Sequence, residues 1–277
     1  MNPAPESASS RLLRRLAGAM PEGVRLAPYR FPLVAGCLRR LLNVSLPGGL
    51  REVEIAAGPL RGRRLVLDLQ TEKFYWLGTY EPLLVKLFQE HVRPGMVAYD
   101  IGGHAGYFAL LLGLLVGDAG RVFTFEPEAQ NAERIRRMIQ ANGIARQITL
   151  VEAAVADQGG EMDFFSGGPA SAQGGVIERR GEGRRVRCIA LDEWGGPAPE
   201  VVKIDLEGAE ALVLRGMQQI LRRHRPRLVI ELHHPAATRE TCEILRECGY
   251  RWRPLQDAPT EKENSELLTG HVEAIPG

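Results

Sequence analysis

The spacing of apolar positions changes along the chain, and the change predicts where strands and helices lie. Between residues 52 and 69, apolar and polar side chains alternate around Gly58-Pro-Leu-Arg-Gly62, which predicts a β-hairpin. From Glu81 onward, short apolar runs alternate with helical patterns. The predicted strands are 96–100, 121–125, 147–155, 162–165, 186–189, 200–205 and 227–232, and the predicted helices are 82–91, 105–116, 128–142, 208–223 and 236–248, before a short C-terminal β-element. This order predicts an α/β fold with a doubly wound, mainly parallel sheet.

The chain before this α/β pattern has a different character. Residues 1–10 are polar and rich in Pro and Ser, which predicts a disordered tail, and residues 11–50 are rich in Arg with short amphipathic pieces. We expect these basic helices to dock on the core, with a peripheral membrane contact as the alternative. We therefore expect an N-terminal extension over residues 1–75 and a main domain over residues 76–277.

Composition excludes several classes of protein. The formal net charge is +1, so no strong field favours nucleic acid, and the four cysteines form no C-x-x-C pair that would indicate a zinc cluster. No run of about 18 apolar residues predicts a transmembrane helix, and the N-terminus lacks the apolar stretch of a signal peptide. We expect a cytoplasmic protein with reduced thiols.

A glycine-rich turn follows the predicted strand at 96–100. It reads Asp100-Ile-Gly-Gly-His-Ala-Gly106 and leads directly into a helical apolar run. Such a unit lets backbone approach a ligand closely at the carboxyl end of a strand. The next predicted strand ends in Glu126, a position from which a carboxylate can accept hydrogen bonds from ribose hydroxyls. Together these features predict a cofactor that contains a nucleoside.

The identity of residue 104 selects among such cofactors. The dinucleotide fingerprint G-x-G-x-x-G, aligned on Gly102, requires glycine where His104 stands, and a side chain there obstructs a pyrophosphate. Asp100 just before the turn repels phosphate and suits an ammonium or hydroxyl group. S-adenosylmethionine, a nucleoside that carries an amino acid, fits this pattern better than NAD. The structural alternative is a tight turn in an α/β protein of other chemistry.

A second group of polar residues lies in Val201-Val-Lys-Ile-Asp-Leu-Glu-Gly-Ala-Glu210. On a strand, Lys203 and Asp205 share one face, and a lysine inside a parallel sheet needs a charged partner. Asp205 or Glu231, from the next predicted strand, would supply it. Glu207 and Glu210 are three residues apart and can share a helix face. These groups either order the strand ends or position an acceptor hydroxyl and remove its proton, and we favour the second role.

Histidines and carboxylates also offer other chemistries. His233 is the best candidate for a general base because of its ordinary pKa, and His104 competes with it. Asp205, Glu231 and a histidine are conceivable ligands of magnesium, but no spacing requires a metal and we expect none. Hydrolysis by a Ser/His/Asp triad is disfavoured because no G-x-S-x-G elbow is present.

These motifs, in this order, resemble the FkbM family of S-adenosylmethionine-dependent methyltransferases. The resemblance extends from about residue 76 to residue 250, and Lys203-Ile-Asp-Leu-Glu-Gly-Ala-Glu210 is its most specific part. The other matching segments are Gly78–Glu81, Asp100–Gly106, Phe125–Pro127, Ala153–Asp157, Leu191–Asp192, Leu214–Gly216 and Ile230–His233. The resemblance implies a seven-stranded class I (Rossmann-like) fold that usually methylates a hydroxyl oxygen of a natural product or sugar. One departure is Gly103, where the family usually has Ala.

The resemblance also implies roles for individual residues. Asp100 and Gly102 would hold the methionine end of the cofactor, Glu126 the ribose, and Asp157 would lie near the adenine. Asp205 and Glu207 would face the methyl group and the acceptor. The full expected cofactor-binding set is Glu81, Asp100, Gly102, His104, Gly106, Glu126, Asp157 and Asp205, and the expected catalytic set is Lys203, Asp205, Glu207 and His233. Residues 1–50 and 158–188 lie outside the pattern and are expected to select the substrate. The Gly-rich part of the second segment is either a mobile lid or a plain surface loop.

The sequence therefore predicts an O-methyltransferase that uses S-adenosylmethionine to modify a small-molecule or glycan hydroxyl, with a homodimer as one arrangement. Three alternatives remain: N-methylation of a protein or RNA, a binding module without turnover, and a nicotinamide-dependent dehydrogenase. The near-neutral charge weakens the RNA alternative.

Overall fold

A computed structural model describes residues 18–19, 48–165, 183–233, 235–255 and 270–277. The predicted tail, nearly all of the basic segment before residue 50, and the middle of the Gly-rich segment lie outside these residues. Among the helices of the described part, none is both long and apolar enough to cross a membrane.

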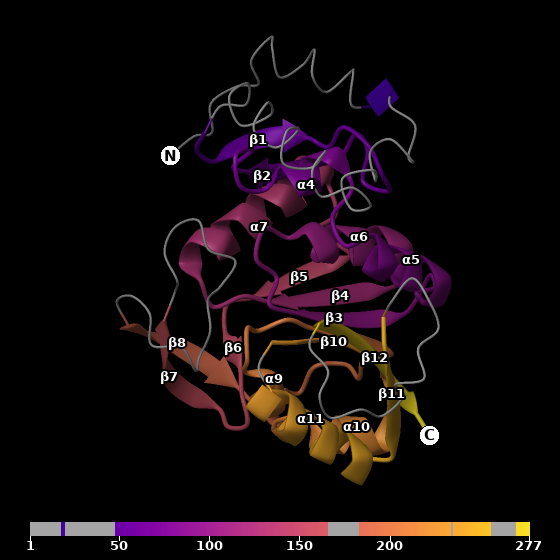
Figure 1. Ribbon diagram of the computed structural model, residues 1–277. Coiled ribbons are helices and arrows are strands. Elements are labelled where there is room, and N and C mark those ends of the chain that lie inside the picture. The colour runs from indigo at the N-terminus through magenta and orange to yellow at the C-terminus, as the bar shows by residue number, and fades with distance from the viewer. Residues whose placement is uncertain (1–17, 20–47, 166–182, 234, 256–269) are drawn as a thin grey trace.

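A seven-stranded sheet forms the centre of the fold (Figure 1). Side by side, its strands are β11 (Tyr250–Pro254), β12 (Gly270–Pro276), β10 (Arg227–Leu232), β9 (Val201–Ile204), β3 (Val97–Ile101), β4 (Arg121–Phe125) and β5 (Ile148–Val151). Neighbours from β10 to β5 are parallel, whereas β12 runs antiparallel to both β10 and β11. The predicted doubly wound, mainly parallel sheet is therefore confirmed, with the strand number of the class I fold.

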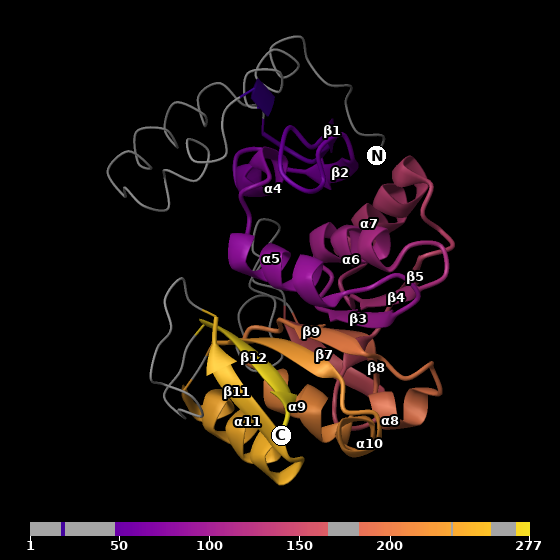
Figure 2. The same ribbon diagram turned by 90° about the vertical axis from the view of Figure 1, so that its right-hand side faces the viewer.

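Helices cover both faces of this sheet (Figures 1 and 2). One layer holds α5 (Pro82–His91), α6 (Tyr107–Val116) and α7 (Ala129–Asn142), and the other holds α8 (Leu191–Trp194), α9 (Glu210–Arg215), α10 (Gln218–Arg223) and α11 (Pro235–Glu247). Because side chains alternate along a strand, Ala98 joins the core under the first layer and Tyr99 joins the core under the second. The two apolar cores fix the sheet between the layers.

Two predicted elements are each divided in the structure. The strand predicted at 147–155 consists of β5 and β6 (Ala154–Val155), and β6 belongs to a separate sheet with β7 (Gly160–Phe165) and β8 (Gly183–Ile189). The single helix predicted at 208–223 was wrong, since α9 and α10 are separated at Gly216. A Cβ at Gly216 would lie 2.0 Å from the carbonyl oxygen of Ala156, so only glycine fits where this turn packs against the backbone just after β6.

The predicted hairpin is confirmed as antiparallel strands β1 (Arg51–Glu54) and β2 (Arg64–Leu67), followed by α4 (Lys73–Leu77). It lies on the outer side of the first helical layer (Figure 2). Arg134 Nε of α7 donates a hydrogen bond to the Val66 carbonyl oxygen at 2.9 Å. Leu65 and Trp76 are buried in the same core as α5 and α6. The boundary at residue 75 stays a prediction, but the hairpin and the first layer share one core.

Truncating Leu65 tests this shared core. Leu65 is fully buried, so Leu65→Ala should lower the free energy of unfolding by about 2–5 kcal/mol. Tryptophan fluorescence and far-UV circular dichroism should still report one common urea midpoint, whereas Arg63→Ala at an exposed position should change little. Separate midpoints for the two signals would contradict a shared core.

Candidate functional site

The site begins where the strand order reverses. The chain runs from β3 outward to β4 and β5, and later returns to β9 and β10 on the other side of β3. Open α/β sheets bind ligands at such a switch point, outside the carboxyl ends of the strands. The glycine turn follows β3, and Asp205 follows β9, so the two motifs singled out in the sequence meet there.

The glycine turn is packed against both neighbouring strands. Gly102 has a φ of 85°, and a Cβ there would lie 2.1 Å from the Asp205 carbonyl oxygen. A Cβ at Gly103 would lie 2.3 Å from Thr124 Oγ1, which itself donates a hydrogen bond to Asp100 Oδ2 at 3.1 Å. Thr124 thus fills the space that an alanine at position 103 would need. The Thr124 side chain therefore accounts for glycine at position 103, where alanine is usual in the family that the sequence resembles.

Lys203 joins the two motifs by charge. Its Nζ lies 3.4 Å from Asp205 Oδ2 and 3.5 Å from Asp100 Oδ1, and it donates a hydrogen bond to the Gly102 carbonyl oxygen at 3.2 Å. Burial alone lowers the pKa of Lys203, but the Asp205 and Asp100 carboxylates outweigh it and raise the pKa. The predicted pair with Asp205 is confirmed. Glu231, the other predicted partner, forms ion pairs with His271 and His233.

Asp100 is fully buried beneath the turn. Burial raises its pKa, against the opposing effect of Lys203. Its carboxylate therefore acts on the turn through Lys203 and Thr124, and direct contact with a cofactor stays a prediction.

Glu126 lies at the end of β4 and holds the turn from the other side. One carboxylate oxygen accepts the His104 amide at 2.8 Å, and the other accepts the Glu128 amide at 2.8 Å. Burial raises the pKa of Glu126 to about 7. The Asn131 side chain also hydrogen-bonds to this carboxylate, so of its about four acceptor positions one remains for a further donor such as a ribose hydroxyl.

His104 adopts a left-handed conformation with a φ of 46° and points toward the N-terminal elements. Its Nδ1 lies 3.3 Å from Tyr75 Oη, and its Nε2 lies 3.5 Å from Glu72 Oε1. Arg134 also pairs with Glu72, at 2.6 Å. Burial and the charges of Arg134 and Lys203 lower the pKa of His104 to about 3. His104 is therefore neutral at pH 7 and is held by Tyr75 and Glu72. Gly106 is the N-cap residue of α6.

A small apolar pocket lies beside the turn. Gly102, Phe125, Pro127 and Leu206 line it together with Ile101, Ala153, Ala154, Val155 and Phe164. Asp157 is not among the lining residues, and its Oδ2 lies 3.9 Å from Arg215 Nε. A contact between Asp157 and an adenine stays a prediction.

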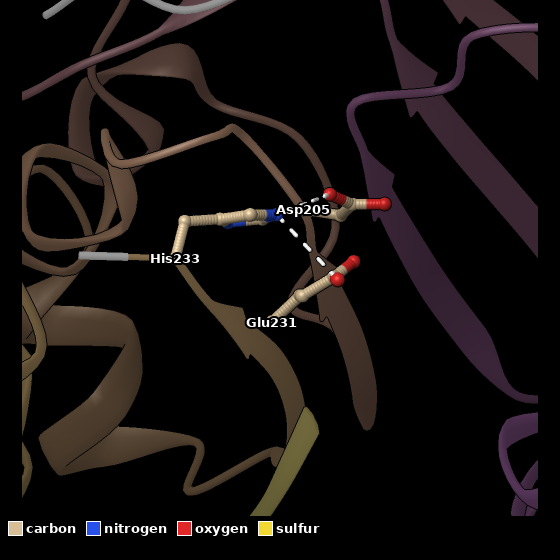
Figure 3. A group of neighbouring side chains, drawn as sticks. All are labelled: Asp205, Glu231 and His233. Carbon is tan, nitrogen blue, oxygen red and sulfur yellow. Dashed lines mark ion pairs between the residues drawn. The ribbon is translucent and has the colours of Figure 1, made fainter. Parts of the chain in front are cut away.

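Four carboxylates lie close to His233, and Figure 3 shows two of them, Asp205 and Glu231. Its Nδ1 lies 2.9 Å from Glu210 Oε1, and its Nε2 lies 3.3 Å from Glu207, 3.5 Å from Glu231 and 3.9 Å from Asp205. Burial opposes the charged ring, but Glu210, Glu231 and Glu207 raise the pKa of His233 to about 9. The imidazole therefore carries its proton at neutral pH. This contradicts the prediction that its ordinary pKa makes it the base.

Glu207 and Glu210 both reach His233, but not from one helix face. Glu207 lies in the turn before α9 with a φ of 51°, and Glu210 begins that helix. Asp205, Glu231 and His233 offer ligand atoms that all lie within 4.8 Å of one another, an arrangement that could hold a metal ion. The expectation of no metal stays a prediction.

His271 completes the group and was not predicted. Its Nε2 lies 3.3 Å from Glu231 Oε2, and its Nδ1 lies 3.6 Å from Glu81 Oε2. It reaches the site because β12 inserts next to β10, with His271 opposite Glu231. Nothing near His271 in the sequence marks this register. Glu81, expected on the cofactor side, thus also lies at the edge with Glu231.

The sequence of the chain matches a known protein family over more than half of its length. The family model of the methyltransferase FkbM domain matches residues 100–252, more than half of the chain. The chain belongs to this family. A hexuronic acid methyltransferase, AglP of Haloferax volcanii, is 24% identical over 168 residues, which cover 59% of this chain and 67% of the relative.

Two solved structures are similar at the level of the fold. The FkbM methyltransferase of Methylobacillus flagellatus has a TM-score of 0.45 at 17% identity, over 74% of this chain and 54% of that chain. Fibrillarin of Aeropyrum pernix, solved with S-adenosyl-L-methionine bound, has a TM-score of 0.44 at 10% identity, over 70% of this chain and 74% of that chain.

Family membership makes the protein a methyltransferase whose cofactor is S-adenosylmethionine. The site agrees with this cofactor in two respects. Glu126 keeps one acceptor position at the end of β4, and His104 stands where a pyrophosphate would need glycine.

Glu126 offers a direct test of the cofactor site. Glu126→Gln should weaken binding of S-adenosylhomocysteine roughly 10–100-fold, because one of the two accepting oxygens becomes an NH₂ group that cannot accept from a backbone amide or a ribose hydroxyl. Isothermal titration calorimetry measures this. The matched control is Glu152→Gln, half-exposed and paired with Arg136 just after β5. Equal affinity in both variants would remove Glu126 from the cofactor site.

His233 makes stability depend on pH. Its folded-state pKa of about 9 lies above the ordinary value of 6.5, so its contribution is complete below pH 6.5 and is lost as pH rises through 9. The difference in unfolding free energy between wild type and His233→Asn should shrink by roughly 2 kcal/mol between pH 6.5 and 9.5. Urea denaturation in EDTA measures it, with exposed His224→Asn as the control. A constant difference would show that His233 is not held protonated.

Proposed function

We propose that the protein transfers a methyl group to a hydroxyl oxygen of a sugar or another small natural product. The observation that carries this proposal is the Asp205 carboxylate, held by Lys203 at the switch point beside the glycine turn. Asp205 remains partly exposed, so it can meet a group that enters from outside the sheet. A carboxylate there is suited to accept the proton of a hydroxyl.

The surrounding charges support Asp205 as the base. Burial raises its pKa, against the effects of Lys203 and His233, and a carboxylate with a raised pKa is a stronger base. Lys203 and His233 both hold their protons at neutral pH and therefore orient Asp205 without competing for a proton. Glu207 is the second candidate, because burial raises its pKa too.

When bound, S-adenosylmethionine supplies a methyl group on a positively charged sulfur, so a carbon–oxygen bond forms as the carbon–sulfur bond breaks. Asp205 takes the proton from the acceptor oxygen. The packed glycine turn and the paired Lys203 fix the two sides of the site before an acceptor arrives, so positioning contributes to the rate.

The Haloferax relative supports a sugar as the acceptor, since it is described as a hexuronic acid methyltransferase. The carboxylates at the strand ends do not favour RNA, whose phosphates they would repel. A protein acceptor, a cytoplasmic location, a homodimer and a membrane contact of the basic segment before residue 50 stay predictions.

Labelled methyl transfer tests this function. Purified protein is incubated with methyl-labelled S-adenosylmethionine and extracts separated by molecular size. The label should enter small molecules or glycans and survive mild alkali, because methyl ethers resist hydrolysis that releases methyl esters. Label that is confined to protein or RNA, or is released by alkali, would overturn the proposal, and S-adenosylhomocysteine binding without any transfer would identify a binding module.

Asp205→Asn tests the proposed base. The amide keeps the shape but cannot take a proton, so kcat should fall about 10²–10⁴-fold while S-adenosylhomocysteine affinity changes only a few-fold. Asp118→Asn, an exposed position between α6 and β4, is the control and should keep full activity. If Asp205→Asn retained its kcat, another group would have to remove the proton.

A further inference from the structure

The charged groups around Asp205 differ in the exposed fraction of their side chains. Four carboxylates are partly exposed, whereas the cations that contact them are more deeply buried. The exposed side-chain fractions are 34% for Glu81, 27% for Glu207, 27% for Glu231 and 23% for Asp205, against 3% for Lys203, 14% for His271 and 16% for His233. A molecule that approaches this edge therefore meets carboxylates first.

The cations are also already engaged. The Lys203 ammonium group contacts Asp100, Asp205 and the Gly102 carbonyl oxygen. His271 lies between Glu81 and Glu231, with one ring nitrogen toward each.

His233 is engaged in the same way. One of its ring nitrogens faces Glu210 and the other faces Glu207, Glu231 and Asp205. None of these three cations is left to bind an anion of the acceptor.

The charges do not balance within this group. Even with both histidines protonated, Lys203, His233 and His271 supply three positive charges. The carboxyl groups they contact are Asp100, Asp205, Glu81, Glu207, Glu210 and Glu231. Asp205 and Glu231 share one proton in a hydrogen bond, so up to five negative charges face three positive ones. A carboxylate on the acceptor would add to the excess, while an ammonium group would reduce it.

We propose that this site selects acceptors by charge: it disfavours an anionic group next to the reacting hydroxyl and favours a protonated amine there, as in an amino sugar. The proposal rests on the proposed function, because it places the acceptor at Asp205. It separates this protein from a methyltransferase that acts on a uronic acid, since the described residues provide no unengaged cation among those that contact Asp205, Glu207 and Glu231.

Three matched sugars test the proposal: methyl glucoside, methyl glucosaminide and methyl glucuronide. Their binding to the complete protein saturated with S-adenosylhomocysteine is measured by ligand-observed NMR in EDTA at pH 7. The glucosaminide should bind most tightly and the glucuronide most weakly, with at least about a tenfold difference in Kd between them at low salt. The difference should narrow as sodium chloride is added, because salt screens partly exposed charges.

Two neutralising variants connect the preference to named residues. Glu207→Gln and Glu231→Gln should each reduce the ratio of the glucuronide Kd to the glucosaminide Kd by a few-fold. The ratio is informative even where a variant weakens all binding. Glu90→Gln, exposed on α5 and outside the segments expected to select the substrate, is the matched control and should leave the ratio unchanged.

Several results would overturn the proposal. Equal binding of the three sugars, or binding of none of them, to the protein loaded with S-adenosylhomocysteine would contradict selection by charge and leave methyl transfer itself intact. A preference for the glucuronide that appears only with Mg²⁺ would show instead that Asp205, Glu231 and His233 hold a cation. Failure to bind S-adenosylhomocysteine would overturn the proposed function and not this inference alone.

Discussion

The buried ammonium of Lys203 is the constraint on which the rest of the site depends. A charge inside a parallel sheet is tolerated only with close partners, and Lys203 has Asp100 on β3 and Asp205 after β9. Its third contact, the Gly102 carbonyl oxygen, transmits this requirement to the glycine turn. The packing of the two central strands and the shape of the cofactor turn are therefore coupled, and loss of either carboxylate would leave Lys203 with one charged partner in place of two.

The pattern of apolar positions was sufficient to predict the fold class, because short apolar runs alternate with helical patterns along the chain. Lys203 and Asp205 could be paired in advance, since they share a face of one strand. Asp100 could not be assigned as the second partner, because that contact requires knowing that β3 lies beside β9. The split at Gly216 was missed for a similar reason, because the turn there packs against the backbone of Ala156, which is distant in sequence.

The electrostatics of the site were less predictable than its members. An ordinary histidine pKa made His233 a candidate base, but the structure gathers Asp205, Glu207, Glu210 and Glu231 around it, and their combined charge keeps the ring protonated. His104 shows the opposite effect, because burial and Arg134 keep it neutral. Side chains from distant segments set both states, so no local pattern could have shown them.

The position of β12 connects the charged edge of the site to the margin of the sheet. β12 lies between β10 and β11, and within the central sheet β11 pairs with β12. Without β12, Glu231 would lose His271 from the opposite position and β11 would lose its partner. One strand therefore both supplies a histidine to the site and attaches the outermost strand to the sheet.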